Sequence, residues 1–519
     1  MRQAILTLVS ACAAALGVST LVRGAVPTPR PPASTLIVGA VLVDGSGGAR
    51  RPGAVRLRGD RVAEVGDLRA AAGERVVDAR GLVLAPGFID THSHGDRGLF
   101  EHREALAAVS QGITTIVAGQ DGGSPWPLSD FFARLQREPA AVNVAAYAGH
   151  GRIRHEVMGE DFRRAATPEE LGRMRALLER ELRAGALGLS TGLEYDPGIY
   201  SAPSEVIELA RVAAAAGGRY ISHVRSEDRH FWEAIDEIVT IGREARLPVQ
   251  VSHVKLAMHS LWGQTDRLLR TLDEARARGI DVTADVYPYL YWQSTLTVLF
   301  PERDFENRAA AEFAVREVST PDGLLLGRFA PEPSYAGQTL AEIALRRGTD
   351  PPATLMALIR EALAYEKKTG SDDVESVIGT SMSEPDLERL LAWPHANICT
   401  DGELDGRHPR GFGTFPRVLG RYVRERGVIS LEEAVRKMTS LAAHSVGLSG
   451  RGEIRPGAAA DLVLFDPATV TDRATTKDPH ALAVGIETVW VNGAVVYEKG
   501  AATARRPGRV LRREARRGN

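Results

Sequence analysis

Residues 84–94 combine a short apolar run with side chains that can bind a metal ion. Their sequence, LAPGFIDTHSH, ends in two histidines separated by one residue. Along a β-strand, residues i and i+2 point to the same side, so Asp90, His92 and His94 share one face. Two imidazoles that meet at the mouth of a barrel can hold one metal ion. Two histidines on a solvated strand edge are the commoner case, so this interpretation requires further ligands downstream.

Residue types that bind metals also end the apolar runs that follow. The central chain alternates eight short runs, rich in β-branched residues, with helical patterns, which predicts an α/β fold with a (β/α)8 barrel. In this fold the chemistry lies at the C-terminal ends of the strands, so polar residues there converge. Each one alone is explained as a buried histidine or a turn residue, but seven together favour a metal site. They are His92 and His94 after strand one, Asp121 after strand two, Glu194 after strand four, His223 after strand five, His253 after strand six and Asp401 after strand eight.

The remaining segments flank this barrel, which we expect over residues 85–449. Residues 294–394 lie between strands seven and eight; they are too many for a plain loop and have a helical pattern, so we expect an inserted helical subdomain. Short β-type runs with glycine and aspartate turns occupy residues 26–84 and 450–519. These two chain ends are predicted to form one small composite β-domain.

The N-terminal residues have the form of a secretory signal. Arg2 precedes an almost wholly apolar run over residues 4–22, and a proline-rich spacer follows. We expect a cleaved signal over residues 1–25 and a periplasmic or secreted protein; an uncleaved membrane anchor is the alternative. No other run is apolar and long enough to span a bilayer, and the formal charge of −2 gives no field that would favour nucleic acid. Cys399 is the single cysteine outside the leader, so no internal disulfide is expected.

Several longer motifs resemble those of a known family. They are APGFIDTHSH, GITTIVAG, GLSTGLEYDPG, SHVRSE, IGREARLPVQVSHVK, DVYPY and CTDGELDGRHPRGFGTFPRVLGRYVRE. On these motifs the chain resembles the amidohydrolase superfamily and, within it, the N-acyl-D-amino-acid deacylase (D-aminoacylase) family, from residue 35 to the C-terminus. The resemblance implies a TIM-type metal-dependent hydrolase barrel, one or two zinc ions at its mouth, and hydrolysis of an amide on a D-amino acid.

The chain departs from the resembling deacylases at one ligand position. Those proteins carry a cysteine after Gly-Asn at the end of strand two, whereas this chain carries Asp121 in the sequence GQDG. A carboxylate is a harder ligand than a thiolate and binds zinc less tightly. Glu194 ends strand four, where many members of the superfamily have a carbamylated lysine that bridges two metals. Either Asp121 or Glu194 could supply the carboxylate that joins His223 and His253, so the number of metal ions stays open.

The ligand types predict a mechanism. Zinc lowers the pKa of a bound water to about 7, and Asp401 is placed to take that water's proton and return it to the leaving amine. A substrate carboxylate requires a cation; Arg225 and Lys255 each follow a ligand histidine by two residues, and both could equally form salt bridges at the barrel rim. The resemblance favours Lys255 and Arg410 as carboxylate contacts. Further substrate contacts are expected from His150 and Tyr195, which could equally be packing residues, and from Tyr289.

The leading hypothesis is a zinc-dependent hydrolase of N-acyl-D-amino acids that acts on a small-molecule substrate. A D-aminopeptidase or dipeptidase, or a cyclic-amide hydrolase of the same superfamily, is the alternative, and it would differ in whether the pocket presents an anion to a substrate amine or cations to a carboxylate. A non-catalytic binding protein built on the barrel is a third hypothesis, and it would not need Asp401. The oligomeric state, the preferred side chain and the acyl length have no signature in the sequence.

Overall fold

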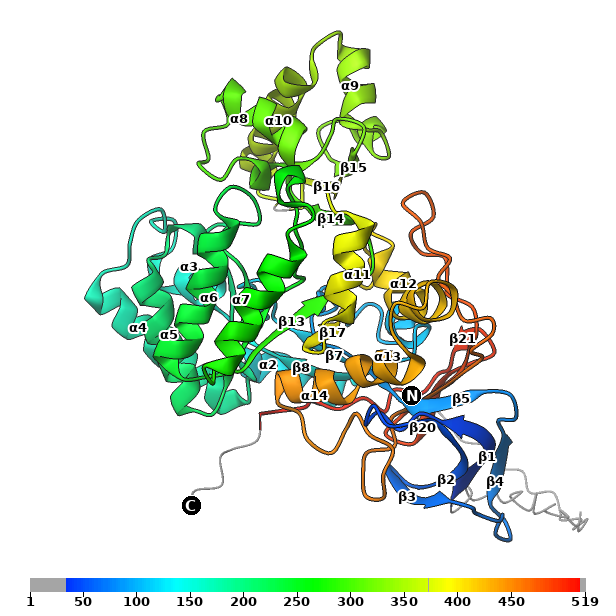
Figure 1. Cartoon of the computed structure of the whole chain (residues 1–519). Coiled ribbons are helices and arrows are strands. Elements are labelled where there is room, and N and C mark those ends of the chain that lie inside the picture. Colours follow the sequence, from blue (N-terminus) through cyan, green and yellow to red (C-terminus); the bar gives the residue numbers. More distant parts are fainter. Residues whose placement is uncertain (1–33, 372, 514–519) are drawn as a thin grey trace, which may run out of the picture.

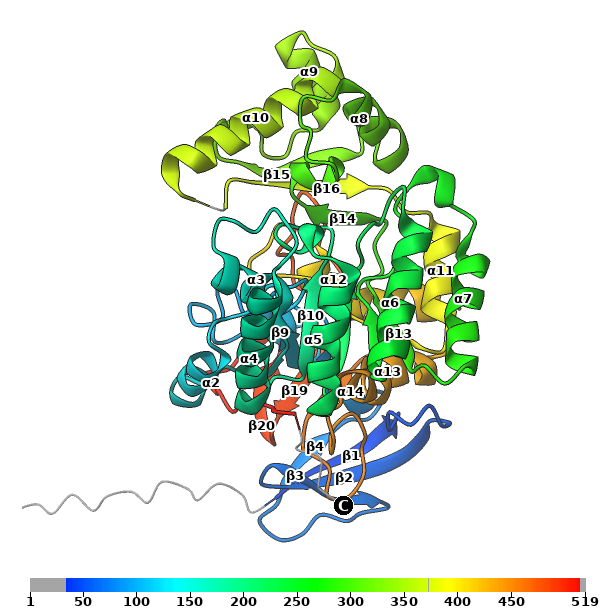
Figure 2. The same cartoon turned by 90° about the vertical axis from the view of Figure 1, so that its left-hand side faces the viewer.

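Three layers follow one another along the molecule in the computed structural model, which describes residues 34–371 and 373–513. A β-domain lies at one end, a barrel in the middle and an inserted subdomain at the other end (Figures 1 and 2). The predicted signal, residues 1–25, lies outside the described residues. No helix in the described ranges is long and apolar enough to cross a membrane.

The middle layer is a ring of parallel strands. Two parallel sheets contribute to it, and they meet where β8 and β9 follow each other on either side of Tyr147. At the other edge, a parallel bridge joins Ser93 to Gly402. The ring therefore has the predicted (β/α)8 architecture; seven of the eight predicted runs contain one strand each, and the third contains both β8 and β9. The strands are β6 (Phe88–Asp90), β7 (Ile113–Ala118), β8 (Asn143–Ala146), β9 (Ala148–Gly149), β10 (Gly188–Gly192), β11 (Arg219–His223), β12 (Val249–Val251), β13 (Val282–Val286) and β17 (Ala396–Ile398).

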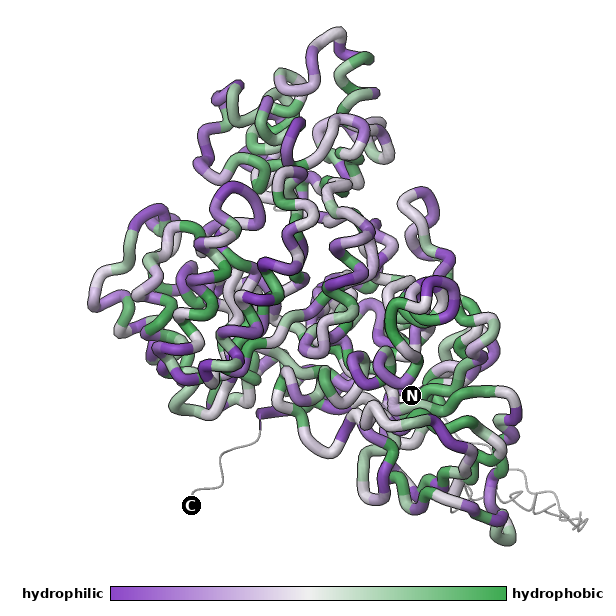
Figure 3. The backbone as a smooth tube through the Cα atoms, in the orientation of Figure 1, coloured by the Kyte–Doolittle hydropathy of each residue, from purple (hydrophilic) through white to green (hydrophobic). Residues whose placement is uncertain are grey.

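Amphipathic helices cover the outside of the ring (Figure 2). In α4, Met174, Leu178 and Leu182 recur every four residues and are buried, while a capping box between Thr167 and Glu170 starts the helix. Figure 3 shows the same alternation of hydrophobic and hydrophilic residues along the helical segments. The covering helices are α1 (Leu106–Val109), α2 (Leu128–Arg137), α3 (His150–Met158), α4 (Pro168–Ala184), α5 (Pro203–Ala215), α6 (Phe231–Ala245), α7 (Thr265–Ala277), α11 (Glu384–Ala392), α12 (Arg410–Arg417), α13 (Leu431–Met438) and α14 (Ser440–Val446).

Strands from both chain ends build the β-domain. Its sheet has nine strands, and the N-terminal and C-terminal parts join where β18 pairs antiparallel with β5. The described part of the arginine-rich tail leaves this sheet and runs along the barrel, where Val510 bridges Val144 and Arg513 N donates to Gly185 O. The strands are β1 (Thr35–Leu42), β2 (Arg51–Arg58), β3 (Arg61–Gly66), β4 (Arg75–Asp78), β5 (Val83–Pro86), β18 (Leu462–Phe465), β19 (Ile486–Val491), β20 (Ala494–Glu498) and β21 (Ala501–Ala502).

The inserted subdomain lies over the barrel and has its own hydrophobic core (Figure 1). The insertion, which the sequence predicts to be helical, also contains three antiparallel strands that form its base. Those strands are short apolar runs that pair only with residues distant in sequence, so their local pattern was weak. In addition, α11 packs against α7 and β17 and so belongs to the barrel. The elements of the insertion are β14 (Tyr291–Ser294), η3 (Leu296–Leu299), α8 (Arg308–Phe313), η4 (Ala314–Val318), β15 (Leu324–Phe329), η5 (Pro333–Tyr335), α9 (Leu340–Arg347), α10 (Pro351–Thr369) and β16 (Glu375–Thr380).

Candidate active site

Four of the predicted ligands meet at the C-terminal mouth of the barrel. The Nε2 atoms of His92 and His94 each lie 3.3 Å from Asp121 Oδ2. The same two nitrogens lie 3.5 and 3.2 Å from Asp401 Oδ1. Two imidazoles and two carboxylates are thus gathered within the distance that a single ion can span.

Two further histidines form a second group on the other side of Asp121. His253 Nε2 lies 3.6 Å from Asp121 Oδ1 and 3.0 Å from His223 Nδ1. Asp121 therefore stands between two histidine pairs, with one carboxylate oxygen facing each. Glu194 Oε2 lies 2.8 Å from His223 Nε2, the ring nitrogen that is not directed at His253. Of the two carboxylates considered from the sequence, Asp121 has the position between the histidine pairs, and Glu194 contacts one histidine from behind.

The backbone turns three of these residues into the mouth. Asp121, His253 and Asp401 have positive φ values of 52°, 33° and 49°. Residues other than glycine rarely adopt this region, and such strain is concentrated at functional sites. Each of the three comes two or three residues after a buried strand, so the barrel holds these bends in place.

Two buried aspartates support the ligands from below. Asp90 accepts hydrogen bonds from the backbone N–H of Thr400 at 2.8 Å and from its hydroxyl at 2.6 Å, which fixes the residue before Asp401. Asp285 accepts the backbone N–H of His253 at 2.5 Å and the thiol of Cys399 at 3.1 Å. Burial raises the pKa of the Cys399 thiol, so it stays protonated and remains a small core residue.

The electrostatics of the mouth favour a bound cation. Burial and Lys255 lower the pKa of His253, but Asp401 and Glu227 outweigh them and raise it to about 9. Burial raises the pKa of Asp121, but the histidines, His92 foremost, hold it well below the usual range. The raised pKa of His253 means that the imidazole binds a proton beside these carboxylates, and a metal ion would replace that proton as the positive charge. Imidazole and carboxylate donors suit zinc, and Asp121 Oδ1 is buried without a hydrogen-bond partner, so the residues fit such an ion.

A cavity opens from the ligands toward the insertion, and four candidate substrate contacts line it. Arg410 Nη1 lies 2.6 Å from Asp401 Oδ2, and its Nε is buried without a hydrogen-bond partner. The Tyr287 hydroxyl is likewise buried and unpartnered, and the guanidinium lies 5.0 Å from its ring. Lys255 Nζ contacts Glu227 and lies 2.8 Å from His253 Nδ1. The ring of Tyr195 packs 4.4 Å from that of His223.

Three other predicted substrate contacts do not line this cavity. Arg225 forms two 2.8 Å contacts with Glu237, the rim salt bridge that was its alternative interpretation. His150 lies 2.8 Å from Glu205 and is fully buried. Tyr289 donates to Pro409 O at 3.4 Å. These three side chains therefore have structural partners.

Sequence reasoning missed Tyr287, Glu227 and Asp285. Asp285 and Tyr287 lie two residues apart at the end of strand seven, so strand alternation puts both on the inner face and was the available signal. Glu227 is the last residue of the run predicted as strand five, but β11 ends at His223 and Glu227 lies in the loop that follows. Its role became visible only from its contacts with Lys255 and with His253 Nδ1 at 3.2 Å.

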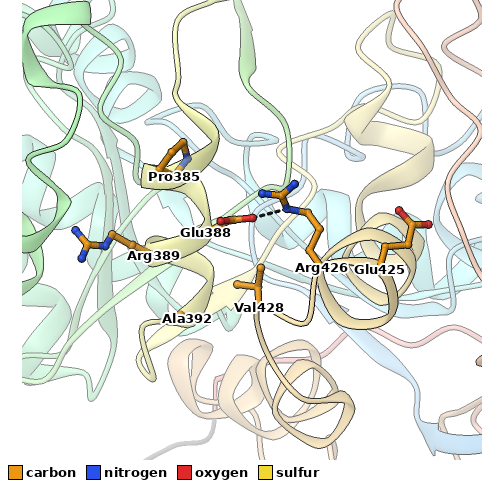
Figure 4. A pocket seen from close by; sticks show the side chains of 7 residues that line it. All are labelled: Pro385, Glu388, Arg389, Ala392, Glu425, Arg426 and Val428. Carbon is orange, nitrogen blue, oxygen red and sulfur yellow. Dashed lines mark hydrogen bonds and ion pairs between the residues drawn. The ribbon is translucent and has the colours of Figure 1, made fainter.

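A different hollow on the outer surface lies between α11 and the end of η6 (Val418–Glu425), as Figure 4 shows. Glu388 and Arg426 point toward each other across it, and Arg389 points away. Its seven lining residues include no histidine or cysteine. We therefore place the functional site at the barrel mouth.

Comparison with known proteins agrees with this site. A model described as "Amidohydrolase family" matches residues 75–325 and 400–497. This chain belongs to the amidohydrolase family. Relatives from Alcaligenes xylosoxydans xylosoxydans include D-aminoacylase, 39% identical over 93% of this chain and 98% of the relative. N-acyl-D-glutamate deacylase (38%, covering 92% and 96%) and N-acyl-D-aspartate deacylase (39%, covering 92% and 95%) from the same organism are similar to the same degree.

Solved structures of two amidohydrolases share the fold. N-acyl-D-glutamate deacylase from Bordetella bronchiseptica, in complex with zinc and a phosphonate inhibitor that mimics the tetrahedral intermediate, matches with a TM-score of 0.82 at 36% identity, over 92% of this chain and 99% of that one. A structure of D-aminoacylase used to study its binuclear metal centre has the same TM-score at 38% identity and the same coverage. The two solved proteins therefore share this barrel fold, and their structures concern a zinc complex and a binuclear metal centre. Both agree with the cluster of metal-binding residues described above.

Proposed function

We propose that this amidohydrolase is a zinc-dependent N-acyl-D-amino-acid deacylase, which cleaves the amide to a carboxylic acid and a free D-amino acid. The observation that carries the proposal is one cavity that joins the His and Asp cluster to two buried, unpartnered hydrogen-bond donors, Arg410 Nε and the Tyr287 hydroxyl. The cluster suits amide hydrolysis, and the donors suit a carboxylate beside it. The names of the relatives agree with both features.

The residues that would hold zinc follow from the distances. His92, His94 and Asp401 would hold one ion and His223 and His253 a second, with Asp121 contributing an oxygen to each. Zinc supplies Lewis-acid polarisation of the amide carbonyl and makes a water molecule acidic near neutral pH. Glu194 would accept the Nε2 proton of His223 and so orient that ring toward the ion.

Asp401 is the group that we propose for proton transfer. Burial raises its pKa, but the charges of Arg410 and His253 outweigh this and lower it, so the carboxylate is ionised at neutral pH. Its Oδ1 faces His92 and His94, and its Oδ2 is held by Arg410 at 2.6 Å. In this position it would accept a proton from the attacking water and pass it to the leaving nitrogen.

The substrate α-carboxylate would bind at Arg410 and Tyr287. Burial raises the pKa of Tyr287 well above its usual range, so its hydroxyl remains a donor. Lys255 and Tyr195 line the same cavity. A cation with a free donor favours a carboxylate over a substrate amine, which supports a deacylase over a D-aminopeptidase or a cyclic-amide hydrolase.

Metal analysis together with a chiral substrate panel tests this function. Purified protein should contain zinc and release free amino acid from N-acetyl-D-amino acids, with little release from the L enantiomers as matched controls. Protein that contains zinc but hydrolyses only dipeptides or cyclic amides would instead be a dipeptidase or a cyclic-amide hydrolase of the same family. Protein with neither metal nor amide hydrolysis would support the binding-protein hypothesis.

We also propose that the protein is exported to the periplasm or secreted. The support is the charged head, apolar run and proline-rich spacer within the first 33 residues. N-terminal sequencing of protein from the extracytoplasmic fraction tests this. A mature protein that begins near residue 26 is expected, and an intact N-terminus in the cytoplasmic fraction would contradict it.

A further inference from the structure

Apolar residues, most of them from the insertion, form one wall of the cavity, beside the polar Gln293 and Ser294 of β14. Trp292 lies on β14, Val298 and Leu299 lie on η3, and Val318 ends η4. Ala257, from the loop after β12, completes this apolar wall. Trp292, Leu299 and Ala257 are 7%, 4% and 4% exposed, so a substrate group that reaches them leaves water almost completely.

Polar contacts hold this wall in position. The Trp292 indole N–H donates to Ser381 Oγ at 2.7 Å. Arg303 donates to Glu194 O at 2.8 Å and so fastens the end of η3 to the barrel beside the metal ligands. His259 Nδ1 lies 2.9 Å from Arg316 O, next to Val318. The wall is therefore a preformed surface of the cavity.

Both lysine and arginine side chains that line this cavity already have anionic partners. Lys255 pairs with Glu227, and Arg410 pairs with Asp401. Two further carboxylates line the cavity; Glu194 contacts His223, and Asp228 accepts the Ser226 hydroxyl at 2.5 Å. Within the described part of this cavity, no basic side chain remains to pair with a second substrate carboxylate.

The geometry also decides which end of the substrate meets the wall. Arg410 lines both this cavity and a wider neighbouring hollow, but Tyr287 lines this cavity and not that hollow, so a carboxylate bound by both donors brings Cα to this cavity. The side chain on Cα must then point into the same cavity. The acyl group, on the other side of the amide, would lead into the wider polar hollow lined by His94, Gly122 and Arg97.

We propose, on the basis of the proposed function, that the enzyme selects apolar D side chains the size of leucine, methionine or phenylalanine and rejects D-aspartate and D-glutamate. An apolar side chain gains from leaving water at the wall. A second carboxylate would lose its hydration without gaining a counter-ion. The three curated relatives, similar to this chain to the same degree, differ by name in this respect, so the cavity and not overall identity makes the distinction.

Nearly isosteric substrate pairs test the proposal on the wild-type enzyme. N-acetyl-D-leucine and N-acetyl-D-aspartate differ mainly in charge, as do N-acetyl-D-methionine and N-acetyl-D-glutamate. We expect kcat/KM to be about a hundredfold or more higher for the apolar member of each pair. The matching N-butyryl compounds should change kcat/KM by less than about tenfold, because the acyl group leaves the cavity.

The variant Val298→Arg tests the wall directly, and Val428→Arg is its matched control. Val298→Arg places a cation on the wall and should shift the preference toward the acidic substrates by about tenfold or more. Val428 lines the outer hollow of Figure 4, so the same change there should leave the preference unaltered. If Val298→Arg does not fold, the comparison of the substrate pairs on the wild-type enzyme still tests the proposal.

The outcomes separate this inference from the proposed function. A wild-type enzyme that prefers N-acetyl-D-aspartate or N-acetyl-D-glutamate overturns the inference and keeps the deacylase. Strong dependence on acyl length with equal rates for all side chains also overturns it, because the wall would then hold the acyl group. No turnover of any N-acyl-D-amino acid overturns the proposed function itself.

Discussion

The two sides of the substrate cavity have different origins. The metal side is built from strand ends of one barrel, where His92, His94, His223 and His253 converge. The opposite wall is built from an insertion with its own hydrophobic core. Under our proposal that the wall selects the substrate side chain, chemistry and side-chain selection are structurally separate. Changes on the metal side should alter turnover of every substrate, and changes on the wall should alter the ratio between substrates.

The largest effect on the metal side is expected for Asp401→Ala. Loss of the proton-transfer group should lower kcat by about a thousandfold or more for apolar and acidic substrates alike. Circular dichroism should show an unchanged fold, and elemental analysis should find most of the zinc. Asp401→Asn, which keeps the shape of the side chain, should be equally inactive. Substantial turnover by either variant would remove Asp401 from the mechanism.

Asp121→Cys sharpens the assignment of the metal ligands. A thiolate between the two histidine pairs should slow zinc loss to a chelator by about tenfold or more, because it is the softer ligand. The cobalt-substituted variant should gain a near-ultraviolet thiolate charge-transfer band that the wild type lacks. Glu194→Gln is the control; it should keep the metal stoichiometry of the wild type. Absence of the band in Asp121→Cys would show that residue 121 does not bind the ion.

Tyr287→Phe tests the carboxylate contact between the two sides. Removing the unpartnered hydroxyl should raise KM about tenfold with a smaller change in kcat, since the α-carboxylate loses one hydrogen bond. Arg225→Lys, whose arginine pairs with Glu237 outside the cavity, should leave KM unchanged. A substrate analogue without the carboxylate should not distinguish Tyr287→Phe from the wild type. An unchanged KM for the normal substrate would show that the α-carboxylate does not bind at Tyr287.

The smallest effect is expected from Glu375, which supports the insertion. Burial raises its pKa from an ordinary value of 4.5 to about 8, although the backbone N–H of Leu296 favours the charged form. The folded protein therefore binds a proton that the unfolded chain releases, and this stabilisation is complete below pH 4.5 and lost as the pH rises toward 8. Glu375→Gln should raise the melting temperature of the insertion by a few degrees at pH 9, relative to wild type, and by less at pH 5. Equal shifts at both pH values would contradict a buried, protonated Glu375.

The sequence predicted the metal side better than the wall, for a physical reason. The barrel follows from alternating strand and helix patterns, and its topology brings residues such as His223 and His253 together without any knowledge of loops. Side-chain direction is harder to predict. The position of Asp121 between the two histidine pairs depends on a backbone bend with positive φ that no periodicity encodes.

Loop and insertion residues were predicted less well. The sequence predicts that Tyr289 contacts substrate; β13 ends at Val286, and the Tyr289 hydroxyl donates to Pro409 O. Arg225 and Lys255 each follow a ligand histidine by two residues, yet the Arg225 side chain pairs with Glu237 on α6. The wall residues Trp292 and Val318 are 26 positions apart in sequence and come together only through the core of the insertion.

Removal and return of zinc tests the central claim most directly. Chelated enzyme should lose nearly all hydrolysis of N-acetyl-D-leucine, and activity should return in proportion to zinc bound at the barrel mouth. Circular dichroism should stay unchanged throughout, so that the loss reports on chemistry and not on unfolding. Full activity in protein shown by elemental analysis to be free of metal would contradict a zinc-dependent site formed by the four histidines and two aspartates.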